Sequence, residues 1–229
     1  MKKFMVVLLV ISVFLMAFGN VASAEKGKAR VGATVGFNAA NTTHETGEGE
    51  SKKMRPTFNA GLAFDYWFSA VMALEILALY NNKGAKWEGS FVDPFGEYSY
   101  KGTDKLAYLS FMALPRYAFG QPGGMRPYIK AGLEFGILLS AKYSEEVTTD
   151  GQTEKQDDVD WKDFAKSSEL AIPFGVGVEF PIGQNITGAF QVMYSLGVTG
   201  IGKDVPEGEK NPKNNVIMVN FLFFFWQNR

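Results

Sequence analysis

The chain has 229 residues, with 23 Lys and Arg against 24 Asp and Glu, no cysteine and one histidine, His44. The balanced charge argues against a nucleic-acid partner, because such proteins normally carry a basic excess, and an apolar content of 46% argues against a disordered chain. The lack of cysteine excludes a disulfide framework and a thiolate metal site, and one histidine leaves little room for a histidine-based metal or catalytic site.

The N-terminal segment has the features of a secretory signal peptide. Lys2 and Lys3 precede an apolar run over residues 4–18, and Ala22-Ser23-Ala24 supplies the small residues of a cleavage site. The run is shorter than the ~20 residues that a membrane-spanning helix needs, and no later apolar run reaches that length. We therefore expect residues 1–24 to be cleaved on export, leaving a soluble protein or a membrane-spanning β-barrel.

Eight later stretches alternate apolar residues with polar or small residues at a period of two, which predicts β-strands. In residues 57–67, for example, Phe58 and Leu62 share one face and Gly61 lies on the other. The stretch 70–81 is less regular, because both of its faces are apolar. The predicted strands cover residues 28–40, 57–67, 70–81, 106–119, 127–143, 169–181, 186–199 and 216–226.

Alternation alone does not say which face points inward. A soluble lipocalin-like carrier would bury the apolar face, whereas a membrane barrel turns it toward lipid. The polar face is rich in small residues such as Gly61, Gly132 and Gly177. Water does not require small side chains, but the narrow interior of an eight-stranded barrel does. We therefore expect Leu62, Phe135 and Val192 to face lipid, a prediction that fails if these side chains are found inside.

The connections and the aromatic residues support the same choice. Long loops are predicted over residues 41–56, 82–105, 144–168 and 200–215, and the other three connections are short. Short turns on one side and long loops on the other are typical of an outer-membrane barrel with periplasmic termini. Aromatic residues at the strand ends predict a double girdle at the two membrane interfaces. Its members are Phe37, Tyr66, Tyr80, Tyr117, Phe119, Tyr143, Phe180 and Phe225.

These patterns predict an all-β fold, an eight-stranded antiparallel up-and-down transmembrane β-barrel that occupies residues 25–229 as a single domain. Hydrocarbon cannot satisfy backbone N–H and C=O groups, so only a closed sheet can cross it. Outer-membrane lipid is then the first partner of the chain.

Several segments follow one another in a recognisable order, namely Leu79-Tyr80-Asn81-Asn82-Lys83-Gly84 and residues 108–117, 127–132, 138–142, 174–180 and 194–198. Their order resembles the PorT-like outer-membrane β-barrel domain family of Gram-negative bacteria. The resemblance implies the same fold and location, and insertion by the barrel-assembly machinery, which we expect to recognise residues 221–226. It transfers no single activity, because barrels of this shape serve unrelated roles. The chain departs from the family pattern at Ser110, where the family has Glu, and at Met112, where it has Pro.

Charged residues of both signs fall on the predicted inner face. They are Arg30, Asp65, Glu75, Arg116, Lys130, Glu134, Lys142, Glu169 and Glu179. A near balance of signs favours mutual pairing in a filled interior, because a selective ion path would favour one sign. We expect Arg116 and Lys130 at the centre of this network, with Glu134 and Glu179 as their counter-charges.

No catalytic, cofactor or metal site is predicted. His44 lies in a polar loop with no orienting partner on a strand end, so we expect a solvated side chain. The acidic segment 144–168 is expected to be a hydrated loop, although its carboxylates leave divalent cation binding open. The predicted function is a non-enzymatic outer-membrane barrel whose long loops contact the envelope or a host surface. The alternatives are a small-solute pore or secretion-accessory barrel, and a soluble periplasmic carrier.

Overall fold

The computed structural model describes residues 27–44, 49–93, 96–183, 186–206 and 208–227. The predicted signal peptide, residues 1–24, lies outside the described residues. Within them, no helix is long and apolar enough to cross a membrane. The helical structure there is one short 3-10 turn, η1 (Lys162–Phe164).

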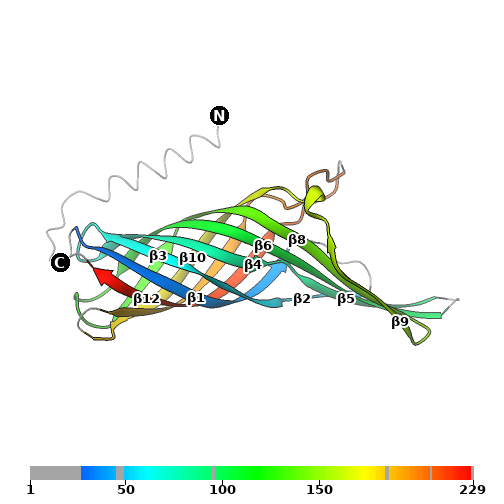
Figure 1. The fold of residues 1–229 in the computed structure, drawn as a ribbon, viewed down its shortest axis with the longest axis horizontal. Helices are drawn as coiled ribbons and strands as arrows, with labels where there is room; N and C mark the ends of the chain where they lie inside the picture. The colour runs from blue at the N-terminus through cyan, green and yellow to red at the C-terminus, as the bar shows by residue number, and fades with distance from the viewer. Residues whose placement is uncertain (1–26, 45–48, 94–95, 184–185, 207, 228–229) are drawn as a thin grey trace.

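Antiparallel strands form a closed ring (Figure 1). β1 pairs with β12 on one side and with β3 on the other, so the first and last strands close the barrel. The strands of the ring are β1 (Ala29–Thr42), β3 (Arg55–Trp67), β4 (Met72–Lys83), β6 (Gly96–Ala118), β7 (Arg126–Ala131), β8 (Leu133–Thr149), β10 (Ser168–Pro181), β11 (Thr187–Gly197) and β12 (Asn214–Gln227).

β7 and β8 make up one of the eight strands in the ring. The two pieces pair with β6 and β10 in the same register on either side of Gly132. The Gly132 N–H donates to the carbonyl of Pro173 at 2.9 Å, but Pro173 has no N–H to return. The hydrogen-bond ladder is interrupted there, but the chain continues in the same direction. β7 and β8 therefore count as one strand, and the predicted eight-stranded barrel is confirmed.

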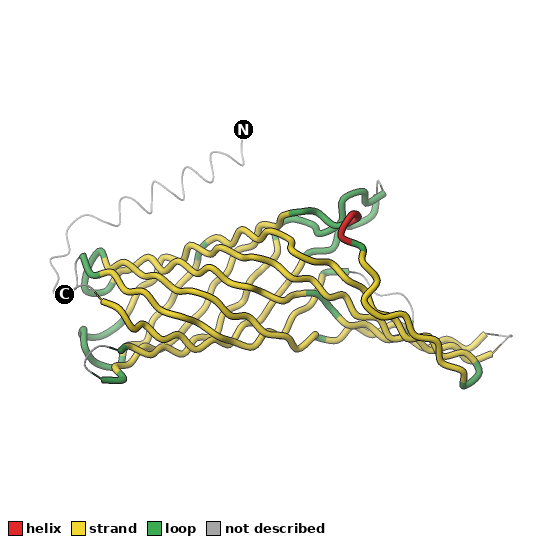
Figure 2. Tube along the Cα trace, in the orientation of Figure 1, coloured by secondary structure: helices red, strands yellow, loops and turns green. Residues whose placement is uncertain are grey.

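The sheet continues beyond the ring at the end of the barrel opposite the start of β1 and the end of β12 (Figure 2). This extension contains β2 (Glu50–Lys53), β5 (Lys86–Asp93), β9 (Gln152–Asp160) and the outer parts of β6 and β8, in the order β2-β5-β6-β8-β9. We name this extension the arm. The prediction of loops over residues 41–56, 82–105 and 144–168 was therefore wrong for much of each range. These segments are rich in Lys and Glu, but they retain cross-strand pairing without an apolar face toward lipid.

The turn at the tip of β8 and β9 shows why this acidic segment forms a hairpin. Asp150 and Gly151 both have positive φ, 49° and 80°. Two such residues in a two-residue connection match the twist of the flanking strands, and Asp-Gly is a favoured pair for that geometry.

The sidedness of the barrel is as predicted. The exposed fractions of Leu62, Phe135 and Val192 are 63%, 44% and 38%, whereas Glu134 is fully buried inside. Large apolar side chains on the outer surface match a lipid solvent. A soluble carrier with its apolar face inward is inconsistent with this arrangement.

A bulge in β8 changes its sidedness near the membrane edge. Ala107 of β6 pairs with Ser140 and Tyr108 pairs with Leu138, so Leu139 is an extra residue. An extra residue moves every later side chain to the opposite face. Two predictions were wrong for this reason. The Lys142 side chain is 44% exposed and lies outside the interior network, and Tyr143 turns away from lipid to stack on Trp87 instead of joining the girdle.

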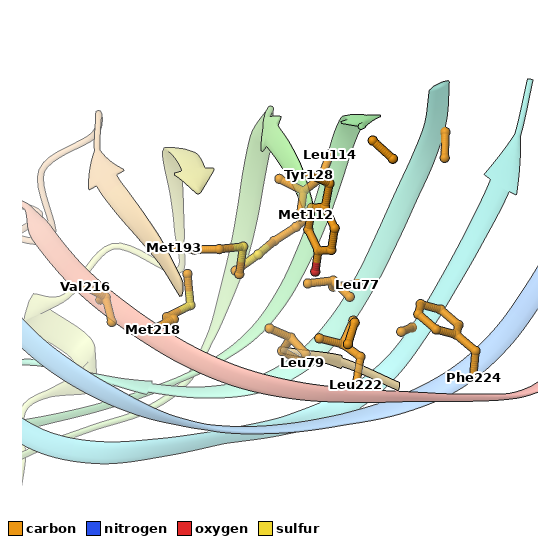
Figure 3. Packing of buried hydrophobic residues seen from close by; sticks show 14 of the residues in the cluster. Leu77, Leu79, Met112, Leu114, Tyr128, Met193, Val216, Met218, Leu222 and Phe224 are labelled. Carbon is orange, nitrogen blue, oxygen red and sulfur yellow. The ribbon is translucent and has the colours of Figure 1, made fainter. Parts of the chain in front are cut away.

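The barrel interior also contains a layer of large apolar side chains, which the sequence pattern did not single out. Leu77 and Leu79 of β4 meet Met112 of β6, Met218 and Leu222 of β12 in the middle of the ring (Figure 3). All five are at most 1% exposed. This layer fills the space between the charged groups described next, so the interior is packed across its width.

Candidate functional site

The first group of buried charges lies at the end of the barrel where β1 begins and β12 ends. We name it the terminus-side cluster, and each member is at most 4% exposed. It draws side chains from six strands, and this is possible because a narrow barrel brings all inner faces together. Its members are Arg30, Asp65, Glu75, Arg116, Arg126, Lys130 and Glu179.

Glu179 is the shared acceptor of this cluster. Its carboxylate accepts hydrogen bonds from Arg30 Nη2 at 2.9 Å, Arg116 Nη2 at 3.0 Å and Arg126 Nε at 2.7 Å. Asp65 accepts from Arg30 Nη2 at 2.6 Å and from Arg116 Nη2 at 3.1 Å. Each guanidinium therefore meets a carboxylate, as buried charges require.

Trp67 forms an aromatic wall for the same cluster. The guanidinium carbons of Arg30, Arg116 and Arg126 lie 5.3, 4.7 and 4.3 Å from the centre of its ring. Trp67 is 1% exposed. A desolvated guanidinium over an indole face gains a cation–π attraction in addition to its ion pairs.

The register of the strands explains why charges in this cluster have more than one partner of opposite sign. Asp65 lies directly opposite Glu75, and Arg116 lies directly opposite Lys130. Like charges at opposed positions repel. Glu75 lies between the two cations, 3.5 Å from Arg116 Nη1 and hydrogen-bonded to Lys130, so each like pair is bridged by an opposite charge.

The second group of buried charges lies nearer the arm and is named the arm-side cluster. Lys83 of β4 contacts Glu134 of β8 at 2.7 Å and also Glu169 of β10. Glu134 accepts a further bond from Ser195 Oγ at 2.6 Å, and Glu169 accepts one from Asn214 Nδ2 at 2.7 Å. Both carboxylates are thus satisfied on more than one side.

A chain of side-chain amides crosses the interior and ends at the arm-side cluster. Asn220 donates to Asn59 at 2.6 Å, Asn59 donates to Asn38 at 2.6 Å, and Asn38 donates to Asn81 at 2.8 Å. Asn81 in turn donates to Glu134 at 3.3 Å. The four amides come from four strands, and Asn59, Asn38 and Asn81 each accept one bond and donate another, whereas Asn220 only donates.

The structure brings together eight of the nine predicted interior residues and adds two. Lys142 is the exception, displaced by the bulge. Lys83 and Arg126 were missed because each lies one or two residues beyond the predicted strand, although continued alternation of the flanking strand would have placed them on the inner face. Lys130 pairs with Glu75, and Glu134 pairs with Lys83, so Glu134 is not a counter-charge of Arg116 or Lys130 as expected. The expected contact between Arg116 and Glu179 is present.

The buried charges balance within the described part of the barrel. The terminus-side cluster has four cations and three carboxylates, and the arm-side cluster has one cation and two carboxylates. Neither cluster presents a surface of one sign, which a charge-selective path requires. No group of three or more His, Asp or Glu side chains in the described ranges is arranged to hold a metal ion.

Most of the predicted girdle lies on the outer surface. The exposed fractions range from 37% for Tyr66 to 73% for Phe37 among the exposed members, and Phe180 is half-buried. The remaining members with exposed rings are Tyr80, Tyr117, Phe119 and Phe225. Tyr143 alone among the predicted girdle residues points to the other face.

His44 and the acidic segment 144–168 both lie in or next to the arm. His44 lines a cavity of about 240 Å³ at the base of the arm together with Glu50, Trp87 and Asp104. The acidic segment forms pairs with lysines across the arm, including Lys105 with Asp158 at 2.8 Å and Lys155 with Glu146 at 2.8 Å. Glu146 and Asp158 are therefore partnered by lysines at the surface of a sheet.

A closed antiparallel ring with lipid-facing apolar residues and a filled, charge-paired interior defines an integral outer-membrane β-barrel protein. The chain belongs to the outer membrane protein beta-barrel domain family, whose model matches residues 21–200. A comparison with curated protein sequences finds no match.

Solved structures similar to this chain include three outer-membrane proteins. Neisserial surface protein A has 12% identity and a TM-score of 0.44, covering 88% of this chain and 100% of that one. Ail, the attachment invasion locus protein of Yersinia pestis, has 15% identity and a TM-score of 0.38, with 87% and 99% covered. Escherichia coli outer membrane protein W has 14% identity and a TM-score of 0.40, with 86% and 98% covered.

Proposed function

We propose that this protein is a non-enzymatic, non-conducting anchor that presents the arm at the cell surface to contact another envelope component or a host surface. The observation that supports it most directly is the filled barrel. Two buried charge clusters whose charges balance each other, and the apolar layer between them, fill the interior, so solute has no continuous open path. The arm projects beyond the membrane-spanning ring.

Conductance in planar bilayers tests this proposal. Refolded protein whose folded state is verified by heat-modifiable migration on a gel is expected to insert without stable current steps. A matched variant, Leu77→Ala with Met112→Ala, keeps the charge clusters and opens the apolar layer, and it serves as the control for sensitivity. Stable ohmic steps from the wild-type protein would contradict the proposal and favour a small-solute pore.

The export and assembly steps are part of the same proposal. Cleavage of residues 1–24 and insertion of residues 25–229 as one domain by the barrel-assembly machinery account for a chain that must cross the inner membrane first. Mass spectrometry of the mature protein is expected to find an N-terminus at Glu25. An intact N-terminus in the outer membrane would contradict cleavage.

In a non-enzymatic anchor, His44 has no catalytic role. It shares a cavity with Thr42, Glu50 and Asp104, and catalysis would require the imidazole and a nucleophile to be held in hydrogen-bond contact by a third, orienting group. The variant His44→Ala is expected to leave the lipid composition of the outer membrane unchanged. A change in lipid acylation measured by mass spectrometry would contradict this.

Within its family, we propose that the chain groups with the PorT-like barrels. The support is the ordered set of segments 79–84, 108–117, 174–180 and 194–198. A profile built only from PorT-like barrels is expected to align with all of these segments without a register shift. A stronger alignment to another branch of the family would contradict the grouping.

A further inference from the structure

The arm has two chemically different faces. In β6, side chains at even positions point into the barrel, as Tyr108 and Ser110 do, and the same face continues into the arm as Tyr98 and Tyr100. The opposite face of the same strand carries Lys101 and other charged residues. The face that continues the barrel interior therefore carries the aromatic rings, together with Glu50, Lys52 and Glu145 at paired positions, whereas the face that continues the lipid surface is charged. The aromatic side chains of the inner face are Trp87, Phe91, Tyr98, Tyr100 and Tyr143.

Two glycines let these rings lie low against the sheet. Gly89 is opposite Tyr100, and a Cβ added at Gly89 would lie 2.6 Å from Tyr100 Cε1. Gly102 is opposite Trp87, and a Cβ added there would lie 2.0 Å from Trp87 Nε1. Any side chain at either position would lift the ring that covers it. A glycine beneath an aromatic ring in this way keeps the ring close to the backbone.

The rings are also nearly parallel in pairs. Trp87 and Tyr143 have ring centres 5.9 Å apart with an angle of 21° between planes, and Phe91 and Tyr100 have centres 5.8 Å apart with an angle of 12°. Phe91 is 43% exposed. The inner face of the arm therefore has a floor made of two pairs of nearly parallel rings, of which Phe91 is exposed to water.

A hollow in this floor combines aromatic and carboxylate groups. It has a volume of about 470 Å³ and is lined by Phe91, Tyr98, Ser99, Tyr100, Glu145 and Val147. Burial, together with a hydrogen bond to Glu145 and the negative charge of that residue, raises the pKa of Tyr143. The hollow thus offers ring faces and one carboxylate, and no cation is among the described residues that line it.

We propose that the inner face of the arm is a binding platform for a neutral glycan, whose sugar rings stack on Tyr100 and Phe91 while a hydroxyl donates to Glu145. The inference rests on the proposed surface function and names the chemistry of the partner. The electron-rich face of an aromatic ring attracts the polarised C–H groups on the apolar face of a sugar ring. The hydroxyls need acceptors, and an ionised carboxylate is acceptor-only.

The charge of the hollow argues for a neutral sugar over a sulfated or carboxylated one. Glu145 would repel an anionic group, and the nearby Lys52 is already bonded to the carbonyl oxygens of Thr42, at 2.7 Å, and His44. The lysines of the outer face point away from the rings. An anionic ligand would instead bind to the lysines of the outer face. Mutations on the inner face and on the outer face therefore distinguish a neutral ligand from an anionic one.

Titration of the folded protein in detergent with three neutral probes, cellotetraose, chitotetraose and mannotetraose, tests the proposal. At least one is expected to bind, with Tyr100→Ala weakening its affinity at least tenfold. Lys101→Ala is the matched control, because it is the next residue of the same strand on the opposite face, and it is expected to leave the affinity within twofold of wild type. Gly102→Val, which lifts Trp87, is expected to weaken binding while heat-modifiable migration is kept.

Sucrose octasulfate and an unstructured apolar peptide serve as the competing probes. Failure of all three neutral sugars to bind, or binding of either competing probe alone, would overturn the inference. Equal losses in Tyr100→Ala and Lys101→Ala would also overturn it, because the effect would not belong to the aromatic face. A silent bilayer recording with no sugar binding would leave the anchor function standing and reject only the glycan platform, whereas current steps would reject the anchor function itself.

Discussion

The barrel and the arm share strands but arrange their residues in opposite ways. In the barrel, β6 turns Phe111 toward lipid and Arg116 inward. In the arm, the same strand turns Tyr100 to the inner face and Lys101 to the outer face. The apolar side therefore switches where the strand leaves the membrane, because the outer solvent changes from hydrocarbon to water. Strand sidedness in this protein is set by what each face contacts.

The largest expected effect on the free energy of unfolding comes from a substitution in the terminus-side cluster of the barrel. Arg116→Ala removes a cation that contacts Asp65, Glu75 and Glu179, leaving buried carboxylates short of a partner. We expect a loss of about 3–5 kcal/mol in the free energy of unfolding, measured by urea titration of the refolded protein. Lys101→Ala, which removes an exposed ion of the arm, is expected to leave the urea midpoint almost unchanged. Equal shifts in the two variants would contradict the distinction between barrel and arm.

A second prediction concerns the outer surface. Leu133→Arg places a charge on a residue that is 64% exposed to lipid, and we expect it to cost about 2–4 kcal/mol near the middle of the bilayer. Val159→Arg changes an apolar residue of the arm that is 45% exposed, and little effect is expected there because water solvates the charge. Unfolding in lipid vesicles measures both, and a mild effect at Leu133 would show that its environment is aqueous.

The smallest expected effect is a pH dependence at the base of the arm. Burial raises the pKa of Asp104 to about 7, and the charge of Arg55 offsets part of that rise. An acid with a raised pKa stabilises the folded arm most at low pH, and that contribution falls as the pH increases from about 4 to about 7. The Asp104 amide, which donates to Ala85 at 2.9 Å, is expected to lose hydrogen-exchange protection over this range after correction for intrinsic rates.

Asp104→Asn is the control for this effect and is expected to flatten the pH dependence. NMR titration of the Asp104 carboxyl carbon provides an independent readout. A midpoint near 4 would show that the side chain is solvated and would contradict the prediction.

The alternation of the sequence was enough to predict the ring of strands, because each membrane strand has one face toward lipid and the other face toward the packed interior. The small residues on one face of the strands indicated that this face points into the barrel. The bulge at Leu139 was not predictable, because Leu138 and Leu139 are both apolar and either can face lipid. Lys142 and Tyr143 were misplaced as a result.

The pairing of the interior charges depended on geometry that the sequence does not contain. The shear of a barrel decides which strands bring their charges to one level. Lys83 is four places from Leu79 on the same face, yet its partners Glu134 and Glu169 come from strands across the ring. The arm was missed for a different reason: its lysines and glutamates resemble those of a hydrated loop, and its pairing is visible only when β5, β6, β8 and β9 are placed side by side.

Spin-label accessibility tests the inversion of sidedness most directly. The chain has no native cysteine, so Leu133→Cys, Val159→Cys and Tyr100→Cys give single labelling sites in protein reconstituted in vesicles. The account predicts that the label at position 133 collides with oxygen and is shielded from a water-soluble nickel reagent, whereas labels at positions 159 and 100 collide with the nickel reagent. A label at position 133 that the nickel reagent reaches, or labels on the arm that only oxygen reaches, would contradict it.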